Sequence, residues 1–246
     1  ATTGGITLTA ANSGTITTTG NGANAGGEVY VYNKASGNIT LGKAITAKGG
    51  TGGGGGVVTV LNADTAGTIA VDAVIDVSKD GGGTDGSILL KAGSNITEGA
   101  SGGVKGDSEG KLLAYSVGGK VLLDTTANNL MATAAFKTDT TLASTNNGTV
   151  TYKDNTGLTI GTVAAVGTLS SPSGGAAAST VGPLSGITTV AGTSNGAVVV
   201  QAGGLLTVDQ AIATTPGTAG VGGAVTLEAT TGGITLTAAN SGTITT

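Results

Sequence analysis

The chain has 246 residues, of which 48 are Gly, while only 10% are charged and 2% aromatic. So few charges exclude the composition typical of disordered chains, and only three Pro exclude collagen. The net charge of −4, without any basic cluster, gives nucleic acid no electrostatic attraction, so we expect no nucleic-acid partner. The sequence contains no uninterrupted apolar run of membrane-spanning length, so we expect no membrane insertion.

One segment occurs twice without a mismatch. Residues 1–18 read ATTGGITLTAANSGTITT, and residues 229–246 have the same sequence. The two copies begin at residues 1 and 229, so the period is 228 residues. We therefore expect residues 1–228 to form one full repeat and residues 229–246 to begin the next, with no true boundary between them. The alternative is a fold whose two ends share a strand motif, but similarity rather than identity would suffice for that.

Short strands that alternate apolar with polar or small residues are predicted along the whole chain. The first strand of each set follows the pattern Gly-x-[Val/Ile]-x-[apolar], with its first apolar residue at Val29, Val58, Ile88, Val121, Val150, Val198 and Val225. A second strand begins at Ile39, Ile69, Ile96, Leu130, Leu158, Leu206 and Ile234. A third lies near Ile45, Ile75, Phe136, Val163, Ile212 and Ile244. No segment has a 3.6-residue apolar period, so almost no helix is expected.

Three short strands in each set of about 30 residues predict one turn of a three-sided solenoid. We predict an all-β fold: a right-handed parallel β-helix (β-solenoid) with three short strands per coil and about seven to eight coils per 228-residue repeat. The seven first strands would stack into interior apolar columns, and residues between the apolar ones, such as Thr59, would face outward. The 48 residues from Val150 to Val198 contain either one long loop or an eighth, irregular turn near Ile187.

A Gly stands two residues before each first apolar position. This residue suits a corner that needs positive φ or leaves no room for a Cβ atom. The predicted structural corner glycines are Gly27, Gly56, Gly86, Gly119, Gly148, Gly196 and Gly223. Segments rich in Gly, Ser or charge are predicted to be loops that leave the coil, at 49–56, 79–86, 98–111 and 170–186. Asn33 and Asn62 share one offset in two strands, which predicts a stacked amide pair.

Apolar side chains at outward positions are candidates for a contact surface, because exposed apolar patches usually mark contacts. In the predicted stacking, four of them would share one outward column and two another. The candidate lateral-contact face consists of Tyr30, Leu89, Leu122 and Val199 in the first column and Tyr32 and Leu61 in the second. Such a face would contact another fibre or a different surface. The alternative is that a nearby loop covers it.

The chain has neither His nor Cys, which excludes nucleophile–His pairs and typical zinc sites. Two carboxylate pairs are close in sequence, Asp72 with Asp76 and Asp107 with Glu109. Such pairs act in glycoside hydrolysis, but here a solvated, outward-facing position is favoured. The segment 81–86 (GGGTDG) and the carboxylates Glu98, Asp107 and Glu109 are the candidates for calcium, which we expect not to be bound. We expect no enzymatic activity, no cofactor and no required metal ion.

Several strings resemble a known family of repetitive proteins. GGITLTAANSGTI, GNITLGKAI, GGLLTVDQAI and GGAVTLEATTGGITLTAA are similar to segments of the filamentous-haemagglutinin-like giant surface proteins of bacteria. The resemblance spans nearly the whole chain and implies a secreted β-helical fibre or adhesin at the bacterial cell surface. The secretion domain and receptor-binding residues of that family have no match here, so neither an export route nor a ligand is carried over.

We therefore expect a structural component of an extracellular bacterial filament, fibre or sheath, whose partner is the adjacent copy of its own repeat, joined head to tail. The stalk of a secreted surface adhesin is the alternative, and a polysaccharide-active β-helix enzyme is the third interpretation. The 228-residue repetition favours the first two over the third, because an enzyme rarely needs many identical copies.

Overall fold

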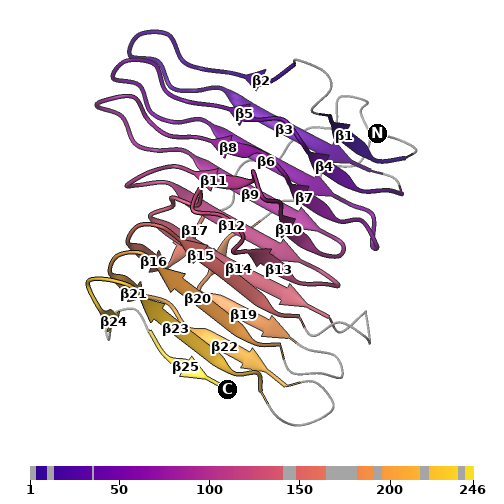
Figure 1. Cartoon of the computed structure of the whole chain (residues 1–246), viewed down its shortest axis with the longest axis vertical. Helices are drawn as coiled ribbons and strands as arrows, with labels where there is room; N and C mark the ends of the chain where they lie inside the picture. The colour runs from indigo at the N-terminus through magenta and orange to yellow at the C-terminus, as the bar shows by residue number, and fades with distance from the viewer. Residues whose placement is uncertain are drawn as a thin grey trace.

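The computed structural model of the chain describes residues 4–9, 14–34, 36–140, 148–164, 182–190, 196–216, 222–237 and 242–246. Within these ranges the protein is all-β, with 25 strands and no helix. The described part accordingly has no helix long and apolar enough to cross a membrane. The strands follow one another along the longest axis of the molecule, with the N-terminus near one end and the C-terminus near the other (Figure 1).

An eight-stranded parallel sheet runs along the molecule. Its strands pair in the order β1 (Ile6–Leu8), β4 (Ile39–Leu41), β7 (Ile69–Val71), β10 (Ile96–Glu98), β13 (Val121–Leu123), β15 (Val150–Asp154), β20 (Val198–Ala202) and β23 (Val225–Ala229). Ile39, Ile69 and Ile96 lie in register and are completely buried. The same interior column continues through Val121 and Val150.

An eleven-stranded sheet forms a second side. Eight of its strands pair in the order β3 (Glu28–Asn33), β6 (Val57–Asn62), β9 (Ser87–Ala92), β12 (Lys111–Ser116), β14 (Thr133–Asp139), β16 (Leu158–Ile160), β21 (Leu206–Val208) and β24 (Ile234–Leu236). The other three are β19 (Ile187–Val190), β22 (Ile212–Thr215) and β25 (Ile244–Thr245). They branch from β14, whose first residues pair with β16 and whose last four pair with β19.

A four-stranded sheet forms the third side in the first half of the molecule only. It contains β2 (Ile16–Thr17), β5 (Ile45–Thr46), β8 (Val74–Asp76) and β11 (Gly103–Lys105). It ends where Lys105 forms a single bridge to Leu130. Between β16 and β19 the chain adds an antiparallel pair, β17 (Thr162–Val163) and β18 (Leu184–Ser185).

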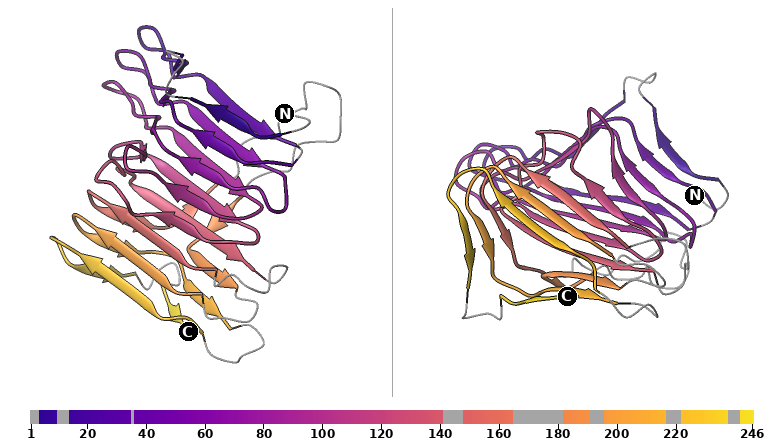
Figure 2. Two further views of the ribbon diagram at one scale, coloured as in Figure 1. Left: turned by 45° about the vertical axis from the view of Figure 1, so that its right-hand side comes forward. Right: turned by 60° about the horizontal axis from the view of Figure 1, so that its bottom comes forward.

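The chain returns to the eight-stranded sheet after every third strand position. β1, β2 and β3 are followed by β4, β5 and β6, each of which pairs in parallel with the strand three places earlier. We call such a set of three positions a coil. Beyond β14 the second and third positions are the two branches of the eleven-stranded sheet. This pairing is compatible with the predicted β-solenoid, and the strands of one coil lie on different sides of a common interior (Figure 2).

Alternation along each strand fills the interior. In β4, for example, Ile39 and Leu41 are completely buried, whereas Thr40 between them is half-buried on the outside. Full burial of one such aliphatic side chain contributes about 1.5–3 kcal/mol. The predicted amide pair is confirmed, because Asn33 and Asn62 lie in register and Asn33 Nδ2 donates to Asn62 Oδ1 at 3.3 Å.

The predicted interior column joins residues of two different sheets. Its first three members, up to Ile88, lie in the eleven-stranded sheet, and Ile88 pairs with Leu112 instead of Val121. Val121 continues the column of Ile96 in the eight-stranded sheet. The prediction was wrong because β12 also has a Gly two residues before its first apolar residue, but that residue is Leu. Without β12, every later strand is assigned to the wrong side.

Two Gly-rich segments predicted to leave the coil, 49–56 and 79–86, project as loops that also stack on one another. Gly55 N donates to Thr84 O at 2.8 Å, and Gly26 N donates to Gly54 O at 2.9 Å. The stacked loops project together from the same corner of successive coils (Figure 1). Segment 98–111 is not one loop either, because it contains β11 with the buried Val104.

The long interval between Val150 and Val198 contains an insertion and no additional coil. β15 pairs directly with β20, so nothing lies between them in the eight-stranded sheet. Ile187 begins β19, which belongs to the same coil as β15. Most of the predicted loop 170–186 lies outside the described residues.

Candidate functional site

The predicted corner glycines occupy two corners of the coil. Three of them precede strands of the eleven-stranded sheet (Gly27, Gly56 and Gly86), and four precede strands of the eight-stranded sheet (Gly119, Gly148, Gly196 and Gly223). A Cβ atom on Gly86 would lie closer to Gly56 O than the 3.0 Å that real Cβ atoms keep, and one on Gly223 would meet Gly196 O in the same way. Gly148 has a φ of 56°. At both corners there is thus a glycine, Gly86 at one and Gly223 at the other, where the backbone of the neighbouring coil leaves no space for a side chain.

The predicted lateral-contact residues do not form one face. Four of them are on the outer side of the eleven-stranded sheet (Tyr30, Tyr32, Leu61 and Leu89), whereas Leu122 and Val199 belong to the eight-stranded sheet. In the eight-stranded sheet Thr151 lies in register between Leu122 and Val199, so that outward column alternates apolar and polar residues. The cause is the same as for the interior column: the predicted stacking omitted β12 and therefore placed residues of two sheets in one column.

A second apolar cluster, here called the outer cluster, covers the outer side of the eleven-stranded sheet. Its buried residues are Leu61, Leu89, Leu113, Ala135 and Val163, with Tyr30, Tyr32, Val57, Tyr115 and Leu184 packed against them. Val163 and Leu184 come from the β17–β18 pair, which therefore covers part of this side. Thr59 was expected to face solvent, but only 7% of it is exposed, because the outer side of this sheet is itself packed.

Three of the four Tyr residues of the chain lie on this outer side and are half-buried. The rings of Tyr30 and Tyr32 stack with centroids 5.9 Å apart. The Nζ atoms of Lys91 and Lys137 lie 5.5 and 5.1 Å from the ring centroid of Tyr115. Burial raises the pKa of Tyr115, and burial together with Lys137 lowers the pKa of Lys91. The surface thus combines aromatic rings with two cations that lie within the range of cation–π attraction.

Two buried carboxylates lie where the four-stranded sheet ends, and sequence reasoning missed their role. Glu98, at the end of β10, accepts hydrogen bonds from the backbone N–H groups of Thr125 and Thr126 at 2.8 and 3.3 Å, and from Asn129 Nδ2 at 3.3 Å. It was grouped with loop carboxylates as a calcium candidate. Its position at the end of an alternating strand was the signal that it could be buried.

Asp154, at the end of β15 and two coils later, has a similar role. Its carboxylate accepts hydrogen bonds from Met131 N, Thr156 N and Tyr152 Oη, each at 2.8 Å. Tyr152 is completely buried and packs against Phe136, with ring centroids 5.0 Å apart. Within the described ranges β11 is the last strand of the four-stranded sheet, and beyond it the two carboxylates satisfy the backbone N–H groups of residues 125, 126 and 131.

These two carboxylates contribute to the pH dependence of stability. Burial is the largest effect on each, and it raises the pKa of Glu98 and of Asp154 above the ordinary value of a carboxyl group. The folded state therefore holds these protons more tightly than the unfolded state. Their contribution to the free energy of unfolding is fully present below about pH 4 and is lost as the pH rises through the folded pKa.

We expect Glu98→Gln to reduce this loss of stability between pH 4 and pH 7. The amide keeps one oxygen acceptor for the N–H groups of Thr125 and Thr126 but does not ionise. Urea unfolding midpoints of the parent and the variant at the two pH values measure the effect. If the two proteins showed the same change, Glu98 would not titrate with a raised pKa.

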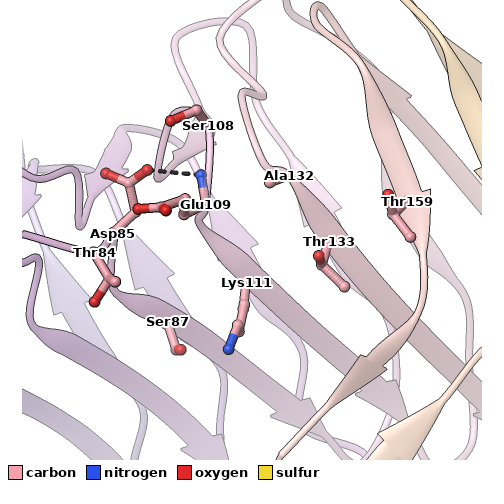
Figure 3. A pocket seen from close by; sticks show the side chains of 9 residues that line it. All are labelled: Thr84, Asp85, Ser87, Ser108, Glu109, Lys111, Ala132, Thr133 and Thr159. Carbon is pink, nitrogen blue, oxygen red and sulfur yellow. Dashed lines mark hydrogen bonds between the residues drawn. The ribbon is translucent and has the colours of Figure 1, made fainter.

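A polar groove of about 520 Å³ opens on the outside, where two loops approach the eleven-stranded sheet. Asp85 and Glu109 lie at one end, Thr133 and Thr159 at the other, and Lys111 lies between them (Figure 3). A carbohydrate-active site would need such a polar lining. It would also need carboxylates that are free to act as acid, base or nucleophile on a bound sugar.

Both carboxylates of the groove are already engaged. Asp85 accepts the backbone N–H groups of Lys79 at 2.7 Å and of Glu109 at 2.8 Å, the second drawn as a dashed line (Figure 3). The Glu109 carboxylate is 2.7 Å from Lys79 Nζ, and this contact lowers the pKa of Glu109. Asp85 thus ties neighbouring loops together. Within the described ranges, no three acidic side chains are grouped so that they could hold a metal ion.

The C-terminal end of the molecule is an open apolar edge. The exposed large apolar residues are Leu205 (44%), Ile234 (45%), Leu236 (53%) and Ile244 (42%). Three of them lie in β24 and β25, for which the described residues supply a partner on one edge only. Unpaired strand edges with apolar side chains are templates for further pairing.

The identical segment at the other end shows what covers such an edge. Ile6 and Leu8 have the same sequence context as Ile234 and Leu236, and they pair with Ile39 and Leu41 of β4. Ile6 and Leu8 are consequently only partly exposed. The C-terminal edge is therefore a strand surface for which this chain already contains the matching strand.

We compared the chain with protein-family models, curated proteins and solved structures. No protein-family model matches the chain, and no curated protein or solved structure is significantly similar to it.

Proposed function

We propose that the chain is a segment of an extracellular structural filament, fibre or sheath on a bacterial surface. Its 228-residue repeats would form a continuous right-handed solenoid with three short strands per coil and seven to eight coils per repeat. One observation carries the proposal. The open strand β24 has the sequence of β1, and the next copy would follow it with a copy of β4, the strand that covers β1.

The energetics favour such continuation. Each coil pairs with the edges of its neighbours, so stability grows with every added coil through nearest-neighbour contacts. Covering β24 and β25 would remove the apolar side chains of Ile234, Leu236 and Ile244 from water. Complete burial of one such side chain contributes about 1.5–3 kcal/mol, and these are about half exposed at present.

The surroundings of the filament are proposed on separate grounds. The extracellular bacterial location is supported by the resemblance of the strand repeats to haemagglutinin-like surface proteins. The partner is the adjacent copy of the same repeat, with lateral contacts through the outer cluster. We propose no enzymatic role, because the groove carboxylates Asp85 and Glu109 are bound by backbone N–H groups and by Lys79.

The size of the natural polypeptide tests the proposal. We expect an antibody against the chain to label the surface of intact cells that express it. On a fully denaturing gel, the same antibody should detect material far larger than the 22.9 kDa of this chain. Protease inhibitors during extraction control for cleavage between repeats. A single band near 23 kDa in inhibited extracts would contradict a continuous array of repeats.

A further inference from the structure

The two identical 18-residue segments occupy different positions in the coil. β1, with the sequence Ile-Thr-Leu, lies in the eight-stranded sheet and pairs with β4. β24 has the same sequence but lies in the eleven-stranded sheet and pairs with β21. The following strand behaves likewise, because β2 lies in the four-stranded sheet and its copy β25 pairs with β22 in the eleven-stranded sheet.

The strand order gives the size of this displacement. From β1 to β23 the eight-stranded sheet makes seven steps, and each step advances the chain by one coil of three positions. β24 follows β23 at the next position. Seven coils of three positions plus one position make twenty-two positions between a strand and its copy. Twenty-two is not a multiple of three, so a copy cannot return to the side on which it began.

We infer that successive 228-residue copies join with an offset of one strand position, so that each copy is turned by one third of a coil relative to the copy before it. This inference builds on the proposed tandem filament. The partner of the open C-terminal end is the segment that follows the repeated 18 residues in a second copy. The axial advance is seven and one third coils, about 35 Å per copy at about 4.8 Å per coil.

The offset predicts which strand of the next copy pairs with β23. The strand Glu28–Asn33 of the next copy would lie on β23 in the eight-stranded sheet, whereas in this chain it lies at one end of the eleven-stranded sheet. Both β23 and β3 pair with one strand only among the described residues. The connection has a suitable length, since ten residues separate β2 from β3 and nine separate β22 from β23.

The two edges also match in sequence. β23 is preceded by Gly223 and presents Val225 and Leu227 inward, and β3 is preceded by Gly27 and presents Val29 and Val31 in the same spacing. In this structure a Cβ atom on Gly223 would collide with Gly196 O, and one on Gly56 with Gly27 O. Gly27 of the next copy would therefore stack on Gly223 through the same contact that joins successive coils at both corners.

One consequence concerns the surface. Tyr30 and Tyr32, on the outer side of β3, would appear on a different side of the filament in each successive copy. Only every third copy would present them in the same direction. The filament would thus offer this contact surface on all three sides, and lateral contacts would not be confined to one face.

A tandem protein tests the offset. It consists of residues 1–246 followed by residues 19–246 of a second copy, so that the natural junction is reproduced. The chain contains no Cys, so introduced cysteines report on one contact only. With Thr226→Cys in the first copy and Tyr30→Cys in the second, the two Cα atoms would be direct neighbours, within the range that a disulfide spans. We expect nearly complete disulfide formation on mild oxidation, seen as a mobility shift on a non-reducing gel.

The control pair is Thr245→Cys in the first copy with Tyr30→Cys in the second. It would form the disulfide only if Glu28–Asn33 stayed in the eleven-stranded sheet beside β25, and that result would overturn the inference. Hydrogen exchange is measured on the tandem protein without substitutions, so its result does not depend on whether a cysteine variant folds. Amides of residues 225–229 in the first copy should exchange at least about tenfold more slowly than in the single chain, whereas those of the second copy, whose edge stays open, should exchange as in the single chain. Unchanged exchange in the first copy would also overturn the inference. Small natural polypeptides on the denaturing gel would contradict the filament but leave both results unaffected.

Discussion

Val121→Asp is expected to lower the free energy of unfolding by at least about 3 kcal/mol. Val121 is completely buried in the interior column of the eight-stranded sheet, in register with Ile96 on one side and Val150 on the other. The new carboxyl group would have only aliphatic neighbours in this column and would lose its water without gaining a partner. For a chain of this length, the loss corresponds to a fall in melting temperature of about 10 °C.

The control for this experiment is Thr151→Asp in the adjacent strand. Thr151 lies between the buried Val150 and Tyr152 and points outward, in register with Leu122. A carboxylate there remains in contact with water, so we expect a change within about 0.5 kcal/mol. Thr59 is not a suitable control, because the outer cluster buries it. Equal shifts in melting temperature for Val121→Asp and Thr151→Asp would contradict the assignment of inner and outer positions.

Gly86→Ala is expected to destabilise the protein by about 3 kcal/mol, at the upper end of the usual cost of overpacking. A Cβ atom at residue 86 would collide with the backbone of Gly56 in the preceding coil. Neither backbone can retreat easily, because Gly86 N donates to Val77 O at 2.8 Å and β6 and β9 are paired along their length. The substitution therefore forces two coils apart at a corner.

Gly82→Ala provides the matched control in the same loop. A Cβ atom there would find its nearest neighbour, Gly52 O, at 3.9 Å, and residue 82 is exposed. We expect a change within about 0.5 kcal/mol, measured by urea unfolding beside Gly86→Ala. If both variants lost the same stability, the close approach at Gly86 would not be the cause.

The local pattern of the sequence was enough to predict the all-β fold and much of the inner and outer alternation. Ile39 and Leu41 are buried and Thr40 between them is not, as period-two alternation requires. Asn33 and Asn62 form the expected amide contact. These features depend on residues within one strand or at equal offsets in neighbouring coils, so they can be seen in the sequence before any tertiary structure is known.

Contacts between distant segments could not be predicted in this way. Leu61 and Leu89 point outward, but the outer cluster that buries them includes Val163 and Leu184, far along the chain. Glu98 was expected on a loop, yet it binds backbone N–H groups from residues 125 and 126. Alternation determines only the side of a strand to which a residue points. Which residues then cover that side depends on where distant segments of the chain pack in the tertiary structure.

The clearest limit is the repeated segment itself. Its 18 residues determine that Ile-Thr-Leu forms a strand with both aliphatic side chains on one side, and this holds at both ends of the chain. The sheet that receives the strand differs, because β1 joins the eight-stranded sheet and β24 the eleven-stranded sheet. Every side of the coil accepts the same alternation. The side is decided by the number of strand positions in between, and β12, which the motif did not reveal, is one of these positions.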